Sequence, residues 1–211
     1  MDMDWARRKA EKYRKAKMKK YEFTGEEKLI NNHTLHRIRA VRDFGIVKAG
    51  DLGGWLEKEE NLSHAGNAWV GDNACVIGAA RVGNNAWVTG AARVTDNAKV
   101  IGAARVTGNA LVGGAARVTG DAWVGGNAWV GGDARVGGDD DFSVISGFGR
   151  FSRTTTFFRC QDGKVRTQCG CFYGDLDEFR AKVKETHGES KMAKEYLMIA
   201  DLMEMHFASE E

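Results

Sequence analysis

The chain has 211 residues, no proline, 43% hydrophobic residues and a formal net charge of +2 at pH 7. This length predicts one or two domains, and the composition is that of a small soluble protein. No apolar run approaches the roughly 20 residues that cross a membrane, and the basic N-terminus lacks the apolar core of a secretion signal. We therefore expect a cytoplasmic protein.

Residues 1–20 are expected to form a basic helical extension. The stretch 5–20 is rich in lysine and arginine and permits a helix, but it lacks a wide apolar stripe, so a solvated helix is expected. Charge alone gives only salt-sensitive, sequence-independent attraction to nucleic acid. Nucleic acid is therefore not an expected partner.

Residues 21–65 are expected to form a capping segment at one end of the repeat that follows. The alternating run 35–42 predicts a strand. The sequence Gly-Asp-Leu-Gly-Gly-Trp at 50–55 predicts a turn over strand edges that would otherwise invite association.

Residues 66–139 carry a repeat with a period of six. Ala-x-Val occurs twelve times without an insertion, from Ala68-Trp69-Val70 onward. On a strand, the Ala and Val side chains point to one side and the residue between them to the other, while Gly or Asn after the Val favours a bend. A period this short is incompatible with repeated helix pairs and predicts a parallel solenoid.

The repeat resembles the hexapeptide-repeat, left-handed β-helix proteins. In that family, three hexads make one triangular coil with an aliphatic side chain at each inner corner. The resemblance implies a mainly β fold of about four coils, and commonly a trimer built by packing solenoid faces. It informs the fold far more than the chemistry.

Coils of eighteen residues sort the outward side chains into three vertical columns. The first is Trp69, Trp87, Arg105 and Trp123; the second is Cys75, Arg93, Leu111 and Trp129; the third is Arg81, Lys99, Arg117 and Arg135. One face of the solenoid is therefore basic, and another is mostly indole.

The basic column needs compensating negative charge. Strands lie about 4.8 Å apart, so adjacent cations repel by on the order of 0.8 kcal/mol even in water. Two interpretations stay open. Asp121 and Asp139, four residues after Arg117 and Arg135, bridge to them from the next corner, or an anionic ligand or an acidic surface of a neighbouring subunit lies on the column.

The stacked tryptophans are too much apolar surface to leave in water on a polar solenoid. Subunit packing is the favoured interpretation, because Trp and Arg commonly anchor interfaces. Stacking of a ligand ring is the alternative. The expected interface residues of a homo-oligomer, with a trimer favoured, are Trp69, Trp87, Arg105, Trp123 and Trp129.

Residues 140–211 are expected to form a small ββαα module. The β-branched and aromatic run 154–159 predicts a strand, Asp162-Gly163 a tight turn, and 164–172 the returning strand. The Gly-rich segment 146–149 is expected to connect this module to the solenoid. Two helices are expected to close the chain, one ending at Gly188 and one with an apolar stripe after it.

Three cysteines invite a metal interpretation. If residue 160 faces residue 165 across the turn, Cys160, Cys169 and Cys171 lie on one side of the ribbon. A zinc site needs four ligands, and CxC is not the usual spacing. We therefore expect small buried hydrophobic side chains here, with no metal and no cofactor.

A second basic cluster follows the solenoid. Guanidinium groups with neighbouring hydroxyls bind phosphate by charge-assisted hydrogen bonds. Exposed strand residues paired to the acids of the last two helices are the alternative. The cluster consists of Arg150, Arg153, Thr154, Thr155, Thr156 and Arg159.

The segments that flank the repeat carry a second resemblance. Residues 34–40, 50–55, 154–159 and 169–172 together look like a group of phage and prophage proteins that hold a hexapeptide solenoid between such ends. This resemblance implies a protein of an infected or lysogenic bacterial host. It implies no settled catalytic motif.

Acyl transfer is the enzymatic alternative. Hexapeptide-repeat acyltransferases typically use a histidine in or beside the coils as general base. The twelve hexads here contain no histidine, and His64, just before the first coil, is the first candidate. Phosphate-loop, HExxH and Gly-x-Ser-x-Gly motifs are absent from the sequence, so no catalytic residue is expected.

The leading hypothesis is a non-catalytic phage-type oligomer that captures an anionic, nucleotide-like small molecule, as a sponge against nucleotide-based host defence. Its ligand would be held by the basic column and the second basic cluster. A structural or assembly β-helix protein of a phage is the competing class. A hexapeptide-class acyltransferase is the third hypothesis.

Overall fold

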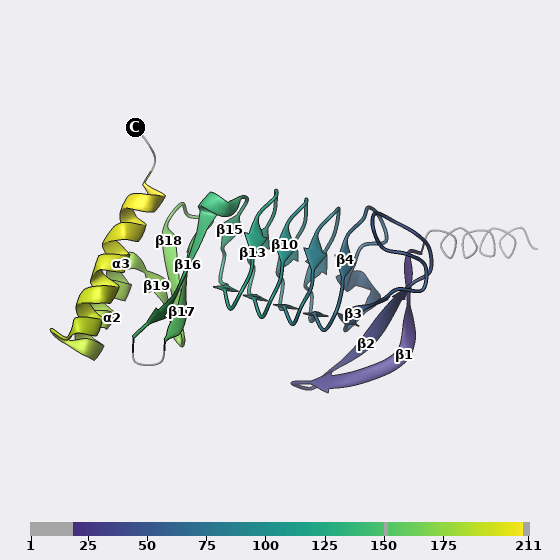
Figure 1. Cartoon of the computed structure of the whole chain (residues 1–211), viewed down its shortest axis with the longest axis horizontal. Helices are drawn as coiled ribbons and strands as arrows, with labels where there is room; N and C mark the ends of the chain where they lie inside the picture. Colours follow the sequence, from purple (N-terminus) through teal and green to yellow (C-terminus); the bar gives the residue numbers. More distant parts are fainter. Residues whose placement is uncertain (1–18, 150–151, 209–211) are drawn as a thin grey trace, which may run out of the picture.

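The computed structural model describes residues 19–149 and 152–208, so the predicted N-terminal helix lies almost entirely outside the described residues. The chain is mainly β: a left-handed parallel β-helix of about five turns is followed by a four-stranded sheet and two helices (Figure 1). No helix among the described residues is both long and apolar enough to span a membrane.

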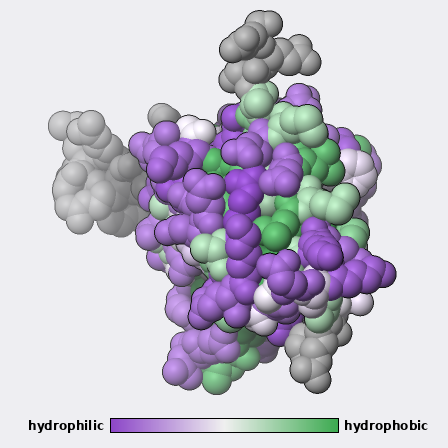
Figure 2. Space-filling view, turned by 90° about the vertical axis from the view of Figure 1, so that its left-hand side faces the viewer, coloured by the Kyte–Doolittle hydropathy of each residue, from purple (hydrophilic) through white to green (hydrophobic). Residues whose placement is uncertain are grey.

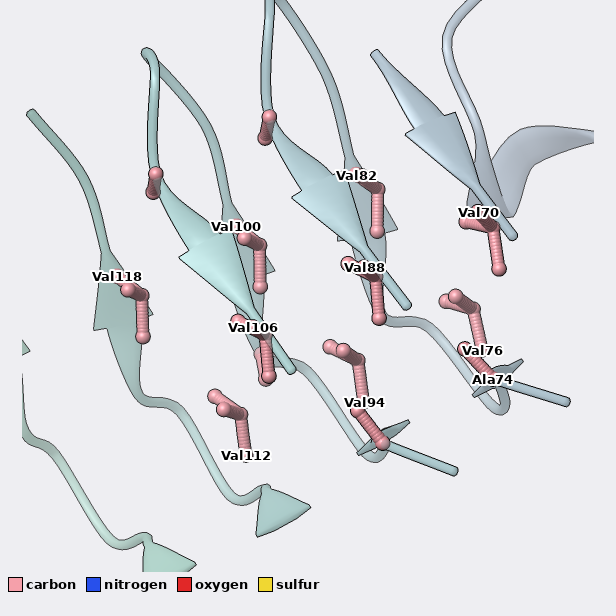
Figure 3. Close-up of a cluster of buried hydrophobic side chains, with 14 of the residues drawn as sticks. Val70, Ala74, Val76, Val82, Val88, Val94, Val100, Val106, Val112 and Val118 are labelled. Carbon is pink, nitrogen blue, oxygen red and sulfur yellow. The ribbon is translucent and has the colours of Figure 1, made fainter. Parts of the chain in front are cut away.

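Each hexad of the repeat forms one two-residue strand and one bend. The Ala and Val side chains of all twelve hexads are at most 1% exposed, and Figure 3 shows Val side chains stacked along the interior. The bends lie at every sixth residue from Gly66 to Gly132, where the backbone has a positive φ. Gly, Asn or Asp occupies every one of these positions, because other residues adopt this conformation only with strain.

The three sides of the solenoid are three sheets of stacked parallel strands. The first contains β4 (Trp69–Val70), β7 (Trp87–Val88), β10 (Arg105–Val106) and β13 (Trp123–Val124); the second contains β5 (Cys75–Val76), β8 (Arg93–Val94), β11 (Leu111–Val112) and β14 (Trp129–Val130); the third contains β6 (Arg81–Val82), β9 (Lys99–Val100), β12 (Arg117–Val118) and β15 (Arg135–Val136). Within each sheet, residues eighteen apart are direct partners. The predicted stacking is confirmed.

The capping segment adds a further partial turn, so the solenoid has about five turns where four were predicted. β3 (Leu52–Leu56) pairs in parallel with β5, and Leu62 bridges to Val82. The hexad pattern does not extend to this turn. Its close approach depends instead on Gly53 and Gly54, where an added Cβ would lie 2.5 Å and 2.6 Å from the nearest neighbouring atoms.

The N-terminal hairpin extends the second sheet. β1 (Tyr21–Ile30) and β2 (His33–Ala40) pair in antiparallel fashion, and β2 pairs with β3. The hairpin projects to one side of the solenoid (Figure 1). The predicted strand at 35–42 is therefore confirmed for most of its length. A 3₁₀ turn (Glu59–Asn61) then leads into the first hexads.

Buried donors close the N-terminal end of the solenoid. Each coil donates its backbone N–H groups to the carbonyls of the next, so free carbonyls are left at this end. Lys20 Nζ donates to the Ala68 carbonyl at 2.6 Å. Asn61 Nδ2 donates to the Gly78 and Ala80 carbonyls at 3.1 Å and 2.8 Å.

Acceptors serve the opposite end, where free N–H groups remain. Asp139 begins a second 3₁₀ turn (Asp139–Asp141) and accepts from the Trp123 N–H at 2.8 Å through Oδ1. Thr156 Oγ1 accepts from the Trp129 N–H at 3.1 Å. Both acceptors come after the last Ala-x-Val of the repeat, at residues 134–136.

The C-terminal module has four strands where two were predicted. β16 (Phe142–Phe148), β17 (Arg153–Arg159), β18 (Val165–Cys169) and β19 (Phe172–Asp175) form an antiparallel sheet in that order. Most of segment 146–149, predicted as a connection, belongs to β16. The reason is that Gly147 has a φ of 92° within a break in the register of β16 and interrupts the strand without ending it.

The sheet lies between the solenoid and the two helices (Figure 1). Neighbouring residues of β17 face opposite sides: Phe158 packs into the core of the solenoid, and Phe157 packs against the helices. α2 (Leu176–His187) and α3 (Lys191–Phe207) form that outer layer. Gly188 ends α2, as predicted.

Candidate functional site

The basic face is the candidate site, and it consists of Arg81, Lys99, Arg117 and Arg135. These residues are direct partners on β6, β9, β12 and β15, one above another on the third sheet. Arg81 and Arg117 are exposed, while Lys99 and Arg135 are half-buried. Because the Ala and Val side chains of each hexad point inward, the residue between them points outward. The cations on successive coils therefore stack one above another.

Internal carboxylates do not neutralise this face within the described residues. None of its four cations forms an ion pair there. Asp139, predicted to bridge to Arg135, accepts instead from the backbone of Trp123. The predicted bridge from Asp121 to Arg117 is likewise not formed. The Asp139 carboxylate instead accepts from a backbone N–H of the last coil, because no further coil supplies a carbonyl to that N–H.

Two adjoining depressions run along the basic face. One has a volume of about 490 Å³ and is lined by Ala79, Arg81, Asn97, Lys99, Ala115, Arg117, Arg135 and Gln161. The other has a volume of about 410 Å³ and is lined by Arg117, Thr119, Arg135, Gly137, Asp141, Arg159, Cys160 and Gly163. Because Arg117 and Arg135 border both, the two depressions adjoin, and together they are called the groove below.

Arg135 lies where the groove meets the C-terminal sheet. Its Nη2 donates to Oε1 of Gln161, a residue in the turn after β17. Its Nη1 is buried and has no hydrogen-bond partner in the described part of the chain. An unpaired buried donor is costly, so an acceptor at this nitrogen would be favourable.

The predicted second basic cluster does not form one surface. Arg150 lies outside the described residues. Thr155 and Thr156 are buried, and each hydroxyl has a hydrogen bond within the chain, to Cys169 Sγ and from the Trp129 N–H. Strand alternation separates the rest: Thr154 contacts Ser146 at 3.0 Å between hydroxyls, while Arg153 lines a cavity beside the helices.

Arg159 is the member of that cluster that borders the basic face. Its Nε lies 3.4 Å from Asp141 Oδ1, and its Nη2 donates to the Phe207 carbonyl at 2.8 Å. These contacts hold its side chain at the end of the groove. The alternative, pairing to acids of the last two helices, does not apply to Arg159 among the described residues, because its partners are Asp141 and the carbonyl at the end of α3.

The tryptophans of the first column differ in exposure. Trp69 is 4% exposed, because Phe44 of the capping segment packs edge-on against it with ring centroids 5.5 Å apart. Its burial therefore needs no second subunit. Trp123 is 55% exposed, and its Nε1 donates to Thr107 Oγ1 at 3.0 Å. Trp87 is half-buried on the same sheet, and Trp129 is 41% exposed on the next one.

The cysteines do not share one side of the C-terminal sheet. Cys160 pairs with Lys164, one residue earlier than predicted, and faces the last coil. Burial raises the pKa of its thiol to about 12, and a hydrogen bond to Asp133 adds to this. Cys169 contacts Thr155 on the helix side. The described residues contain no group of three or more His, Cys, Asp or Glu suited to a metal ion.

His64 has both ring nitrogens engaged. Nδ1 lies 3.4 Å from the backbone N–H of Lys20, and Nε2 lies 2.7 Å from Glu59 Oε1. The imidazole also stacks on Tyr21 with ring centroids 4.4 Å apart. These contacts fix the ring within the capping segment.

No protein-family model matches the chain. It is 36% identical over 70 residues to the uncharacterized acetyltransferase YdcK of Escherichia coli (strain K12), a stretch of 29% of this chain and 22% of that protein. The chain thus spans about a fifth of the length of the curated relative it matches. Fold and match together support a β-helix repeat protein, and they give no support to the resemblance to phage proteins.

Proposed function

We propose that the chain is a β-helix protein that binds a phosphate-bearing small anion in the groove along its basic face. One observation carries the proposal: four cations stack on successive coils with no carboxylate partner in the described residues. Each adjacent pair repels by on the order of 0.8 kcal/mol in water. A bound anion would remove this repulsion and gain charge-assisted hydrogen bonds.

The spacing of the cations favours a ligand with more than one phosphate. Adjacent strands lie about 4.8 Å apart, so a single phosphate reaches one or two coils and a diphosphate spans more. Arg117 is central, because it borders both depressions. The exposed indoles belong to the other two sheets, so base stacking on Trp123 would require a second copy of the chain.

Calorimetry tests the proposal directly. ATP, ADP-ribose and coenzyme A are titrated into the purified protein at low salt. We expect at least one of them to bind, and Arg117→Glu to weaken that binding by about tenfold or more, the loss expected for a hydrogen bond between charged groups. Arg93→Glu is the matched control, since it makes the same charge change at an exposed position on another sheet. Absence of binding by all three ligands would refute the proposal.

Acetyl transfer is the second candidate, and the comparison favours it. The matched relative is named as an acetyltransferase, and acetyl-coenzyme A is itself a phosphate-bearing nucleotide that the groove would suit. A general base is still required, and His64 is occupied by its contacts. The assay is release of coenzyme A thiol with amine and hydroxyl acceptors. Turnover abolished by His64→Ala would establish transfer, whereas binding without turnover would leave a capture protein.

Two narrower parts of the hypothesis stay predictions. A homo-oligomer, with a trimer favoured, would bury Trp87, Arg105 and Trp123, and light scattering of the wild type and of Trp123→Glu measures it. Sequestration of a nucleotide signal in a phage-infected host requires binding at nanomolar to micromolar concentration and no turnover. A structural or assembly role predicts an oligomer that binds none of the three ligands.

A further inference from the structure

A second cavity lies at the opposite end of the molecule from the capping segment, on the helix side of the C-terminal sheet. It has a volume of about 510 Å³ and is lined by Gly149, Arg153, Cys169, Cys171, Phe172, Phe179, Lys182, Val183, Thr186, His187, Met192 and Tyr196. The sheet separates it from the solenoid, since β17 faces the two with alternate residues. It is therefore independent of the groove on the basic face.

The inner wall of this cavity is aromatic and aliphatic. Phe179 contacts Phe172 and Tyr196, with ring centroids 5.6 Å and 5.8 Å apart. Val183 of α2 and Met192 of α3 complete the wall. A cavity of this size with an apolar lining and a few polar groups is the usual form of a small-molecule site.

Basic side chains lie around the cavity, and no carboxylate is among the lining residues that the structure describes. Lys182 contributes an exposed ammonium, which also contacts Glu185 at 2.9 Å on the outer surface. His187 stacks on Tyr196 with ring centroids 6.0 Å apart. Arg153 contributes a guanidinium from β17. Figure 2 looks onto this end, where hydrophobic residues lie among hydrophilic ones.

We infer that this cavity binds a small aromatic carboxylate. The ring would pack among Phe172, Phe179 and Tyr196, and the carboxylate would lie near Lys182, Arg153 and His187. Aromatic rings pair favourably at offset or edge-on geometry, and carboxylates form their strongest hydrogen bonds with ionised donors. A cation of the same shape would meet positive or neutral groups among the lining residues that the structure describes.

The probe is 2-naphthoate, titrated calorimetrically into the full chain. The comparison ligand is the naphthalen-2-ylmethylammonium ion, which keeps the ring and reverses the charge. We expect saturable binding of naphthoate at one site per chain and at least tenfold weaker binding of the cation. Lys182→Glu is expected to weaken naphthoate binding by about fivefold, the scale of an exposed charge pair.

Lys184→Glu is the matched control, because it makes the same change on the same helix outside the cavity lining. We expect it to alter naphthoate affinity less than twofold. Met192→Trp is expected to abolish binding by filling the cavity, with circular dichroism to confirm folding. Arg117→Glu should leave naphthoate affinity unchanged, which separates this site from the groove. Absence of naphthoate binding, equal binding of the cation, or equal losses in the two lysine variants would each overturn the inference.

Discussion

The two ends of the solenoid leave different backbone groups unpaired, and side chains of the matching hydrogen-bonding type meet each. Free carbonyls at the N-terminal end meet donors, the Lys20 ammonium and the Asn61 amide, and both side chains are 0% exposed. Free N–H groups at the C-terminal end meet acceptors, the Asp139 carboxylate and the Thr156 hydroxyl. The chain therefore places polar groups of the required sign at each end of its backbone ladder.

Burial also differs between the ends. The N-terminal donors are enclosed by the capping segment, whereas Asp139 lies at an exposed corner and the aromatic ring of Phe158 fills the C-terminal end. A buried hydrogen bond costs more to lose than an exposed one, because water cannot replace the missing partner. Hydrogen bonds from the buried donors, here called polar closure, should therefore contribute most to stability at the N-terminal end. Apolar packing should contribute most at the C-terminal end.

Phe158→Ala tests apolar packing at the C-terminal end and has the largest expected effect. The ring is 0% exposed and packs on the last coil, so its loss should lower the free energy of unfolding by about 3–5 kcal/mol. Hydrogen exchange should show amides of the last coil losing protection. Phe157→Ala removes an equally buried ring from the helix side and should deprotect α2 and α3 instead. Identical exchange patterns in the two variants would contradict the division of β17 between two cores.

Lys20→Met tests polar closure at the N-terminal end. Methionine keeps much of the aliphatic stem but leaves the Ala68 carbonyl without its donor, so we expect a loss of about 1.5–3 kcal/mol in urea unfolding. Lys19→Met is the control, because the Lys19 side chain is 43% exposed and, among the described residues, its ion pair is a surface one with Glu59, worth about 1 kcal/mol or less. Equal losses in the two variants would show that the buried donor is not needed.

Asp139→Ala tests the exposed acceptor. The Trp123 N–H loses its partner but stays open to water, so the expected loss is about 1 kcal/mol. Asp140→Ala, one residue along the same 3₁₀ turn, should change stability by less than about 0.5 kcal/mol, as is usual for surface substitutions. A loss for Asp139→Ala larger than that for Lys20→Met would reverse the proposed contrast between the ends.

The repeat was predictable because its information is local. Each hexad carries its own inward Ala and Val and its own bend residue, so the strand-and-bend unit and the parallel solenoid follow from spacing. The coil of eighteen, and with it the three outward columns, followed from the resemblance to hexapeptide-repeat proteins. The ends were not predictable, since Lys20, Asn61 and Asp139 act on partners set by the three-dimensional fold. One signal was available: adjacent Phe157 and Phe158 on a strand must face opposite sides, which indicates two cores.

The same difference between local and long-range information applies to the candidate site. The placement of the basic face was predicted from the repeat and is confirmed, because it depends only on register. The predicted phosphate cluster after the solenoid was not formed, because the sheet that caps the last coil buries Thr155 and Thr156. The cavity beside the helices was missed. Its lining comes from β17, β18, β19, α2, α3 and the turns after β16 and β18, and no spacing in the sequence brings these together.

The pH dependence of stability gives the smallest effect and the sharpest test of Lys20. Burial, with the charge of Arg42 adding to it, lowers the pKa of this ammonium from 10.5 to about 8. Between these two values the unfolded chain holds the proton that the folded chain has released, so Lys20 makes stability rise with pH. The free energy of unfolding of the wild type relative to Lys20→Met should therefore increase by about 1 kcal/mol from pH 7 to pH 9. Cys160 and Tyr173 have pKa values raised to about 12 by burial, and both proteins contain them. Their contributions to the pH dependence of stability therefore cancel in this difference. A difference that stays constant with pH would mean that Lys20 titrates as it does in the unfolded chain and is not enclosed by the capping segment.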